Sequence, residues 1–478
     1  MRFLPLALAS LAAAHTPVHA EKLADAIAAA YATNPELAAA RASLRQVDEA
    51  LPIARVGMRP RVDGTINFSQ DLDDQLNDFG RSTTAGVRIT QPVWAGGRVQ
   101  AEIRAADARV AAARQRLAAL ENRIIADTVA AYADVLATRA EVELNRNQVR
   151  VLSEQLRASS DRFEVGDLTR TDVAQSQARL ENARAALAAA EGEAQRAEQA
   201  YRRLVGQLPG TLAPLPELPE MPKTAEAARE TALDRNPDLL AARFDEAAGE
   251  ASVTAARRER FGQASVTSTI AYQAINGGPL APFQVDGLTG RIGVTMSIPL
   301  MTSGLISART RQAEAAQSQA LETIEATTRA VVEGATNAFV VLSVAESVIR
   351  SARVAIDANA LAAEGVRQEN LVGSRDIIEV LNAEQELLNA RVALVRAERD
   401  RYVAGYRLLQ VTGQAKLVAP GLDGPAYDPA ANFRRVDRSW REFRADPDPR
   451  RDRARNRPPG APEPEPLPPP PPGIRSAR

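Results

Sequence analysis

The side chains that most enzymes use for covalent chemistry are nearly absent from this sequence. It contains no cysteine and two histidines, His15 and His19. Both histidines lie in a segment that is typical of a secretory signal, with a short apolar run and the cleavage pattern Val18-His19-Ala20. Once residues 1–20 are removed as a signal peptide, we expect no thiol nucleophile, no imidazole base and no soft metal ligand.

Carboxylates are abundant in the rest of the chain. Without the signal, the chain has 58 basic against 60 acidic residues, a net charge of −2, which gives no reason to expect nucleic acid as a partner. Some hydrolases work with carboxylates alone, so an envelope enzyme of this kind is an alternative function. No pair of acids stands out from the helical background, however. We therefore predict that the protein is not an enzyme and has no catalytic, cofactor-binding or metal-binding residues.

An internal duplication organises the elements that position the remaining side chains. Two Val-Gly pairs, Val165-Gly166 and Val372-Gly373, stand 207 residues apart. The same offset aligns further positions: Pro92 with Pro299, Gly97 with Gly304, Tyr132 with Phe339, and Leu180 with Leu387. Asn34-Pro35 matches Asn236-Pro237 at an offset of 202. So many ordered matches indicate a true structural repeat.

Each half is predicted to contain two strands. Apolar and polar residues alternate over residues 62–70, 85–93, 264–273 and 291–300. Strands of about 9–11 residues can cross a bilayer at a tilt, although a half-buried soluble sheet has the same pattern. Because no later stretch supplies the ~18 apolar residues of a spanning helix, membrane insertion requires strands. Four strands cannot close a barrel alone, so the membrane interpretation requires several chains.

The connections between the paired strands differ in chemistry. Residues 70–84 are acidic, whereas residues 274–288 are rich in glycine and proline. Both are predicted to be solvent-facing hairpin loops.

Long helices are predicted on either side of each Val-Gly pair. No proline interrupts residues 98–162, which would form a helix of roughly 100 Å at ~1.5 Å per residue. Apolar residues recur there every seven positions, at Ile103, Val110, Leu117 and Ile124. This repeat predicts coiled-coil packing. The glycine of each Val-Gly pair is suited to end a helix, so each pair is expected to turn the chain into a hairpin far from the strands.

Composition predicts the domain boundaries. The first repeat spans 21–210 and the second 224–420, and between them the proline-rich linker 211–223 cannot be a continuous helix. A C-terminal extension follows at 421–445. Residues 446–478 are rich in proline and arginine and are expected to form a disordered tail, because they cannot bury a core.

Together these motifs resemble the TolC family of outer-membrane efflux proteins. The resemblance covers about residues 21–420, and Tyr427–Trp440 is similar to C-terminal extensions of some members. The motifs that carry it are the two Asn-Pro helices, the strand-to-helix passages TQPVWAGGR (90–98) and SIPLMTSG (297–304), and the tip motifs FEVGDLTRTDV (163–173) and LVGSRDIIEVL (371–381).

The resemblance implies a mainly α protein with some β-structure. Long coiled-coil helical hairpins in two structural repeats would join four antiparallel strands per chain, and three chains would close a twelve-stranded transmembrane β-barrel. It further implies an outer-membrane channel whose helical part lies in the periplasm. Such a homotrimer is the passive exit duct of a tripartite efflux pump or a type I secretion system. The implied partners are outer-membrane lipid, a periplasmic adaptor protein and an inner-membrane pump, either ABC-type or proton-driven.

The resemblance also implies a gate at the periplasmic helix tips. The family's Thr-Asp pair falls on Thr171-Asp172 and its arginine on Arg375, so an Asp172–Arg375 salt link is expected. The family's tyrosine and second aspartate fall on Asn370 and Asn382, so this chain lacks those partners. By the same analogy the adaptor-docking tips are Val165, Gly166, Leu168, Thr169, Val372, Gly373 and Ser374. The alternative is that these residues are ordinary solvated charges and helix turns.

A periplasmic adaptor is a further alternative, because adaptors also carry coiled-coil hairpins. An adaptor would need lipoyl-like and β-barrel domains after a single hairpin. Two complete copies of the same helix–strand unit argue against it.

Overall fold

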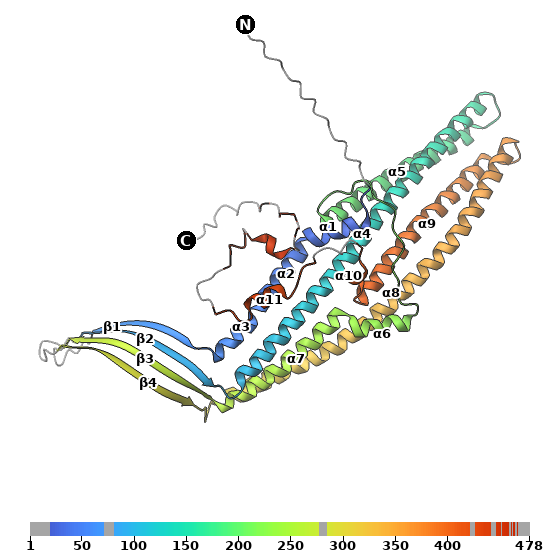
Figure 1. Ribbon diagram of the computed structural model, residues 1–478. Coiled ribbons are helices and arrows are strands. Elements are labelled where there is room, and N and C mark those ends of the chain that lie inside the picture. Colours follow the sequence, from blue (N-terminus) through green and yellow to red (C-terminus); the bar gives the residue numbers. More distant parts are fainter. Residues whose placement is uncertain are drawn as a thin grey trace, which may run out of the picture.

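The protein is long, with a sheet at one end and two helical hairpins at the other (Figure 1). The computed structural model describes residues 20–70, 81–276, 284–420 and 426–440, and in the tail residues 446–450, 452–457, 460, 462–463 and 466. Apart from residue 20, the expected signal peptide lies outside the described residues.

Both halves follow the same order of elements, as the predicted duplication requires. The first half contains α1 (Leu23–Thr33), α2 (Pro35–Asp48), α3 (Ala50–Arg55), β1 (Arg61–Gln70), β2 (Arg81–Trp94), α4 (Arg98–Glu164) and α5 (Arg170–Val205). The second contains α6 (Ala225–Arg235), α7 (Pro237–Arg258), β3 (Gln263–Asn276), β4 (Gln284–Ser297), α8 (Leu305–Leu371) and α9 (Ile377–Val411). Short 3-10 helices, η1 (Val56–Met58) and η2 (Glu259–Phe261), lead into β1 and β3. Helices α4 and α8 are each 67 residues long.

The Asn-Pro motif has the same structural role in both halves. Asn34 begins α2 and accepts hydrogen bonds from two backbone amides, and Asn236 does the same for α7. The following proline suits the first helical position. Each asparagine also donates from Nδ2 to a carbonyl in the last turn of the second long helix of its own half, α5 for Asn34 and α9 for Asn236. Asn34 reaches Leu204 O at 3.3 Å, and Asn236 reaches Val411 O at 2.8 Å.

The four strands form one antiparallel sheet in the order β1-β2-β3-β4. Two of its hairpin connections are shorter than predicted, because residues 81–84, 274–276 and 284–288 continue the strands. Aspartate and glycine obscure the alternation in residues 284–288, yet the backbone still pairs there, as at Gln284 opposite Asn276. The prediction of a strand over residues 291–300 also extends beyond the observed end of β4. The strand ends at Ser297, before Pro299, which has no amide to donate to the ladder.

The main hydrophobic core lies where α1 crosses the long helices. It gathers leucine, isoleucine and alanine side chains with five buried tyrosines: Tyr31, Tyr132, Tyr201, Tyr402 and Tyr406. Burial raises the pKa of Tyr132 to about 12, and its hydroxyl donates to the carbonyl of Ala213 at 2.7 Å. This bond anchors the proline-rich linker to α4. The predicted heptad seam is confirmed at Val110, Leu117 and Ile124, all of which are buried.

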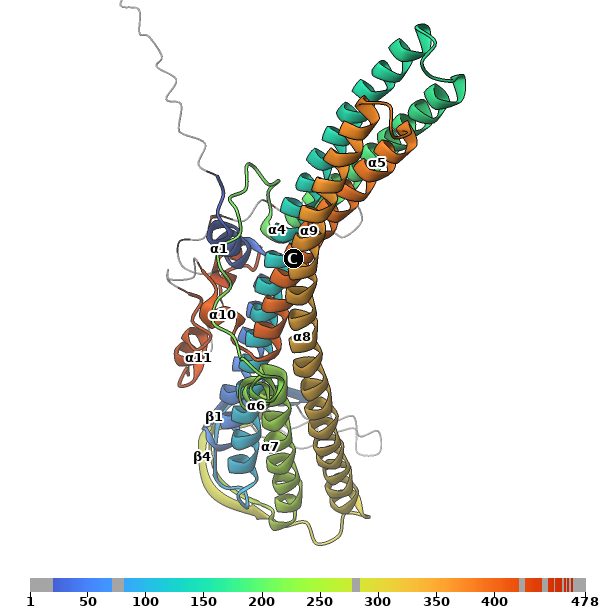
Figure 2. The ribbon, with the colours of Figure 1, turned by 90° about the vertical axis from the view of Figure 1, so that its right-hand side faces the viewer.

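A segment after the second repeat packs back on the first. We call Tyr427–Trp440 the C-terminal strap; it contains α11 (Ala431–Val436) and follows the short helix α10 (Ala415–Val418). Figure 2 shows α1, α10 and α11 on one side of the long helices. Arg55 donates to the carbonyl of Asp437 at 2.7 Å, and Asn432 donates to the carboxylate of Asp48 at 2.9 Å.

Part of the tail, for which disorder is expected from composition, makes defined contacts in the structure. A 3-10 helix, η3 (Arg453–Asn456), lies against α2, where buried Arg41 donates to the carbonyl of Asn456 at 3.4 Å. Asp446 pairs with Arg435 at 3.1 Å and with Arg455 at 3.0 Å. Polar contacts rather than an apolar core hold this part, which is why a composition argument missed it.

Candidate functional site

The two hairpin tips have nearly the same backbone. Helix α4 ends at Val165 (φ −90°, ψ 2°) and α8 at Val372 (φ −93°, ψ 5°). The following Gly166 and Gly373 take φ of +83° and +78°, a conformation that favours glycine. Each valine side chain is 80% exposed. The molecule therefore presents two matching apolar points at the end farthest from the sheet (Figure 1).

The residues predicted to dock an adaptor all lie in these two turns. Thr169 begins α5, Leu168 is half-buried beside it, and Ser374 is exposed and donates from its backbone amide to the carbonyl of Glu369 at 3.0 Å.

In the first tip, Asp172 is engaged by its own helix end. The Thr169 amide and hydroxyl donate to Asp172 Oδ2 at 2.9 and 2.7 Å, and the Asp172 amide donates back to Thr169 Oγ1 at 3.3 Å. This reciprocal arrangement is a capping box. The hydrogen bonds from the Thr169 side chain and backbone hold the pKa of Asp172 below its usual value. Thr171, next to it, is exposed.

In the second tip, Arg375 is held by two glutamates. Its Nε donates to Glu369 at 2.8 Å, and Nη1 donates to Glu379. The expected Asp172–Arg375 salt link is therefore not formed within this chain. Each charge has its partners in its own tip, three to six residues away, and these are closer along the chain than the opposite hairpin.

The two asparagines that the sequence resemblance assigned to the gate have different surroundings. Asn370 is buried and donates from Nδ2 to the backbone carbonyl of Arg375 at 2.7 Å, so it supports the turn. Asn382 is exposed on α9 and accepts a hydrogen bond from Arg179 on α5 at 2.8 Å. Of these two asparagines, Asn382 is the one that links the two hairpins.

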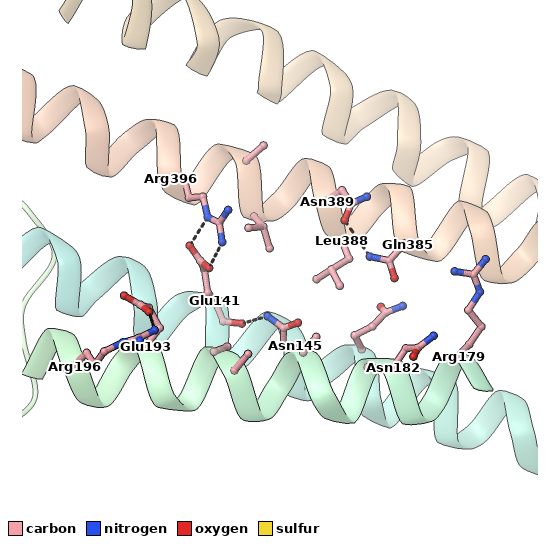
Figure 3. Close-up of a pocket in the computed structure, with 17 residues that line it drawn as sticks. Glu141, Asn145, Arg179, Asn182, Glu193, Arg196, Gln385, Leu388, Asn389 and Arg396 are labelled. Atoms are coloured by element: carbon pink, nitrogen blue, oxygen red, sulfur yellow. Dashed lines mark hydrogen bonds and ion pairs between the residues drawn. The ribbon is translucent and has the colours of Figure 1, made fainter. Parts of the chain in front are cut away.

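An open groove of about 820 Å³ runs between α5 and α9 (Figure 3). Arg396 on α9 and Glu141 on α4 close one end with two hydrogen bonds of 2.8 Å, which raise the pKa of Arg396. Toward the tips, Leu152, Leu180 and Leu381 are part of an apolar cluster that joins the hairpins. The hairpins are thus joined by a few defined contacts on either side of a polar groove.

The sheet has two chemically different faces. Alternate residues form an exposed apolar face across all four strands: Val62, Ile66, Phe68, Val87, Ile89, Ile270, Tyr272, Leu288, Ile292, Val294 and Met296. Phe68 is 78% exposed and Ile292 is 79% exposed. The opposite, polar face is mainly threonine, serine, glycine and a few charges. So large an exposed apolar surface marks a face that meets lipid or protein.

A buried charge cluster near the core was not predicted from the sequence. Glu121 is 3% exposed and accepts hydrogen bonds from Lys416 at 2.6 Å and from the Tyr31 hydroxyl at 2.8 Å. Arg41 lies 3.9 Å from the same carboxylate. A buried charge needs such partners, and here they tie α1, α2 and α10 to α4.

No group of three histidine, cysteine, aspartate or glutamate residues in the described part of the chain is placed to hold a metal ion. Among the same residues, no helix has both the length and the apolar character needed to span a membrane.

Comparison with known proteins identifies related chains. A family model described as outer membrane efflux protein matches residues 26–207 and 228–414. The outer membrane efflux protein BepC of Brucella suis is 33% identical over 421 residues, which cover 88% of this chain and 91% of BepC. The outer membrane protein TolC of Vibrio cholerae is 26% identical over 423 residues, 86% and 95% of the two chains. The crystal structure of the Campylobacter jejuni CmeC outer membrane channel has a similar fold, with a TM-score of 0.74 at 17% identity over 87% of this chain and 89% of that one.

Proposed function

The chain belongs to the outer membrane efflux protein family, and from this premise we propose that three copies form one passive exit duct through the outer membrane. The sheets of the three chains close a barrel in the membrane, and the helical hairpins continue it as a tunnel into the periplasm. The observation that carries this proposal is the sheet, which has an exposed apolar face and two unpaired edges.

The edges of the sheet explain why one copy is not enough. Among the residues that the structure describes, strands β1 and β4 each have a neighbour on one side only. Unpaired backbone amides and carbonyls are costly in lipid, so strands can span a membrane only in a closed barrel. In the trimer, β4 of one copy pairs with β1 of the next, and the apolar face meets the lipid.

The long helices also offer a surface to a second copy. Val341, Val344 and Val348 form an apolar stripe on α8, and their side chains are about half exposed. Such a stripe at helical spacing suits coiled-coil packing between copies.

We further propose that the hairpin tips dock a periplasmic adaptor. Val165 and Val372 offer two matching apolar contacts, and three copies would present six around one ring. The chain itself does no covalent chemistry in this proposal. An inner-membrane pump supplies the energy, and the adaptor connects that pump to the duct.

The gate lies at the same end and includes Thr171, Asp172, Asn370, Arg375 and Asn382. Its closure within one chain rests on contacts between hairpins, such as Arg179–Asn382, rather than on an Asp172–Arg375 pair. Opening the gate separates the second hairpin from the first.

The experiment is to express the full chain, separate the envelope fractions and run unheated denaturing gels. A heat-sensitive trimer in the outer-membrane fraction that conducts ions in planar bilayers supports the duct. A monomer in the soluble periplasmic fraction would contradict it.

A further inference from the structure

The polar face of the sheet carries an uneven set of charges. Its charged side chains in the described strands are Arg61, Asp63, Arg88 and Arg291, three bases and one acid. Asp63 forms an ion pair with Arg61, whose Nε donates to Asp63 Oδ1 at 2.8 Å. Arg88 and Arg291 are exposed and have no acidic partner among the described residues. Two positive charges per chain are therefore not balanced on this face.

These two arginines lie in one row across the sheet. Asp63 is opposite Arg88, Arg88 is opposite Thr269, and Thr269 is opposite Arg291. Directly opposite residues in antiparallel strands project to the same face. With neighbouring strands ~4.8 Å apart, the backbones at Arg88 and Arg291 are roughly 10 Å apart. One threonine separates them.

Small residues surround both arginines on that face. Along β2, Arg88 stands between Gly86 and Thr90, and along β4, Arg291 stands between Thr289 and Gly293. Apart from Arg61, which pairs with Asp63, Arg88 and Arg291 have the longest side chains on the polar face of the described strands.

We propose that Arg88 and Arg291 form an arginine ring in the channel lumen, which favours the passage of anionic molecules. This inference rests on the proposed trimer, in which the polar faces of three sheets line the duct. Three copies would contribute six uncompensated arginines at one level of the barrel.

The dimensions of such a barrel make the ring effective. Twelve strands at ~4.8 Å spacing and a tilt of ~40° enclose a barrel roughly 24 Å across, measured between backbones. Arginine side chains that project inward narrow the open lumen further. The Debye length is ~8 Å at 0.15 M salt and ~30 Å at 0.01 M, so the potential of the ring reaches the axis in dilute salt. Low-dielectric walls focus the field, which raises the local concentration of anions.

The ring does not need to bind its permeant tightly. Conduction requires contacts that are weak enough to release the ion or molecule. Guanidinium groups on flexible stems in an open lumen meet that need and still match carboxylate and phosphate groups. The permeants favoured are therefore carboxylate- or phosphate-bearing molecules.

The test measures reversal potentials of purified trimers in planar bilayers under a tenfold KCl gradient. In the double variant Arg88→Gln/Arg291→Gln, we expect the chloride-to-potassium permeability ratio to fall roughly threefold with 10 mM salt on the dilute side, and the difference to vanish near 1 M. Arg81→Gln is the matched control, because Arg81 lies on the same strand but on the other face, opposite Gln70. It should leave the ratio unchanged.

A second variant and a second readout keep the result decisive. Asp63→Asn frees Arg61 and should raise the chloride preference. Inositol hexakisphosphate added from the outer side should block the wild type at a concentration about tenfold lower than it blocks the double variant, since each lost charge weakens a close ionic contact. Equal permeability ratios and equal block in wild type and double variant would overturn the arginine ring. A wild type without trimers or conductance would instead overturn the proposed function.

Discussion

Asn370 donates a hydrogen bond from Nδ2 to the backbone carbonyl of Arg375 at 2.7 Å, across the turn of the second hairpin tip. The asparagine is only 8% exposed, although the tip around it is open to solvent. Asn370, which the sequence resemblance assigned to the gate, therefore supports the shape of the turn. It fixes the loop from which Val372 and Arg375 project.

Replacing Asn370 by alanine should loosen this tip without unfolding the protein. The change leaves the Arg375 carbonyl without its donor, at a cost of about 1 kcal/mol. Amide hydrogen exchange of residues 371–376 should become severalfold faster, while residues 165–170 of the first tip stay unchanged. Asn382→Ala, an exposed site, is the control and should leave exchange in the turn unaffected.

Charge reversal at Arg375 should open the gate more than neutralisation of Asp172. Arg375→Glu places three acids together, because Glu369 and Glu379 already flank it. Like charges at this spacing repel, so the start of α9 should fray and single-channel conductance should rise.

Asp172→Asn separates the two accounts of the gate. If an Asp172–Arg375 link held the gate, both variants would raise conductance equally. The structure instead predicts only a weaker helix cap and little change in conductance for Asp172→Asn, since Asp172 bonds to Thr169.

The C-terminal strap should detach when its bond to α2 is removed. Asn432→Ala leaves the buried Asp48 carboxylate without its 2.9 Å donor, which destabilises the docked state by about 1–3 kcal/mol. Trypsin should then cut the strap faster at Arg434 and Arg435 in native protein. Arg438→Lys is the control variant, because it keeps a trypsin site at a side chain that is 93% exposed. Trypsin should cut its strap at Arg434 and Arg435 at the wild-type rate. Equal rates in all three proteins would show that Asn432 does not hold the strap.

Strap docking should also depend on pH through Asp48. Burial raises the pKa of this carboxyl above its ordinary value, although Asn432 and Arg114 act in the opposite direction. A raised pKa means that the charged form is disfavoured in the folded state, so the penalty is present at neutral pH and is relieved as pH falls through the raised pKa. Tryptic cleavage of the strap is measured after brief incubation of the protein at different pH values. The rate of cleavage should fall toward acidic pH. In Asp48→Asn this trend should disappear.

Features set by local pattern could be predicted from the sequence, and features set by contacts between distant segments could not. The seven-residue spacing of Val110, Leu117 and Ile124 predicted the helical seam, because a helix repeats its faces over short distances. The two left-handed glycines of the tips followed from the Val-Gly pairs in the same way.

The missed contacts join residues far apart in the chain. Lys416 and Glu121 are 295 residues apart, and Arg396 and Glu141 are 255 apart. Each is one of many charges on a helix surface, and nothing local distinguishes it from its neighbours. The Asp172–Arg375 pair is not formed within one chain for a related reason, since the resemblance supplied the pair but not the nearer partners Thr169 and Glu369.

The most direct test of the central claim is the accessibility of alternate residues on β4 in intact outer membranes. The natural chain has no cysteine, so single-cysteine variants at Ile292, Gly293, Val294 and Thr295 can be labelled without background. We predict that a water-soluble maleimide modifies positions 293 and 295, which line the lumen. Positions 292 and 294 should resist it and instead react with a lipid-soluble maleimide. Equal labelling of all four positions by the water-soluble reagent would mean that the apolar face does not meet lipid, and would contradict the barrel.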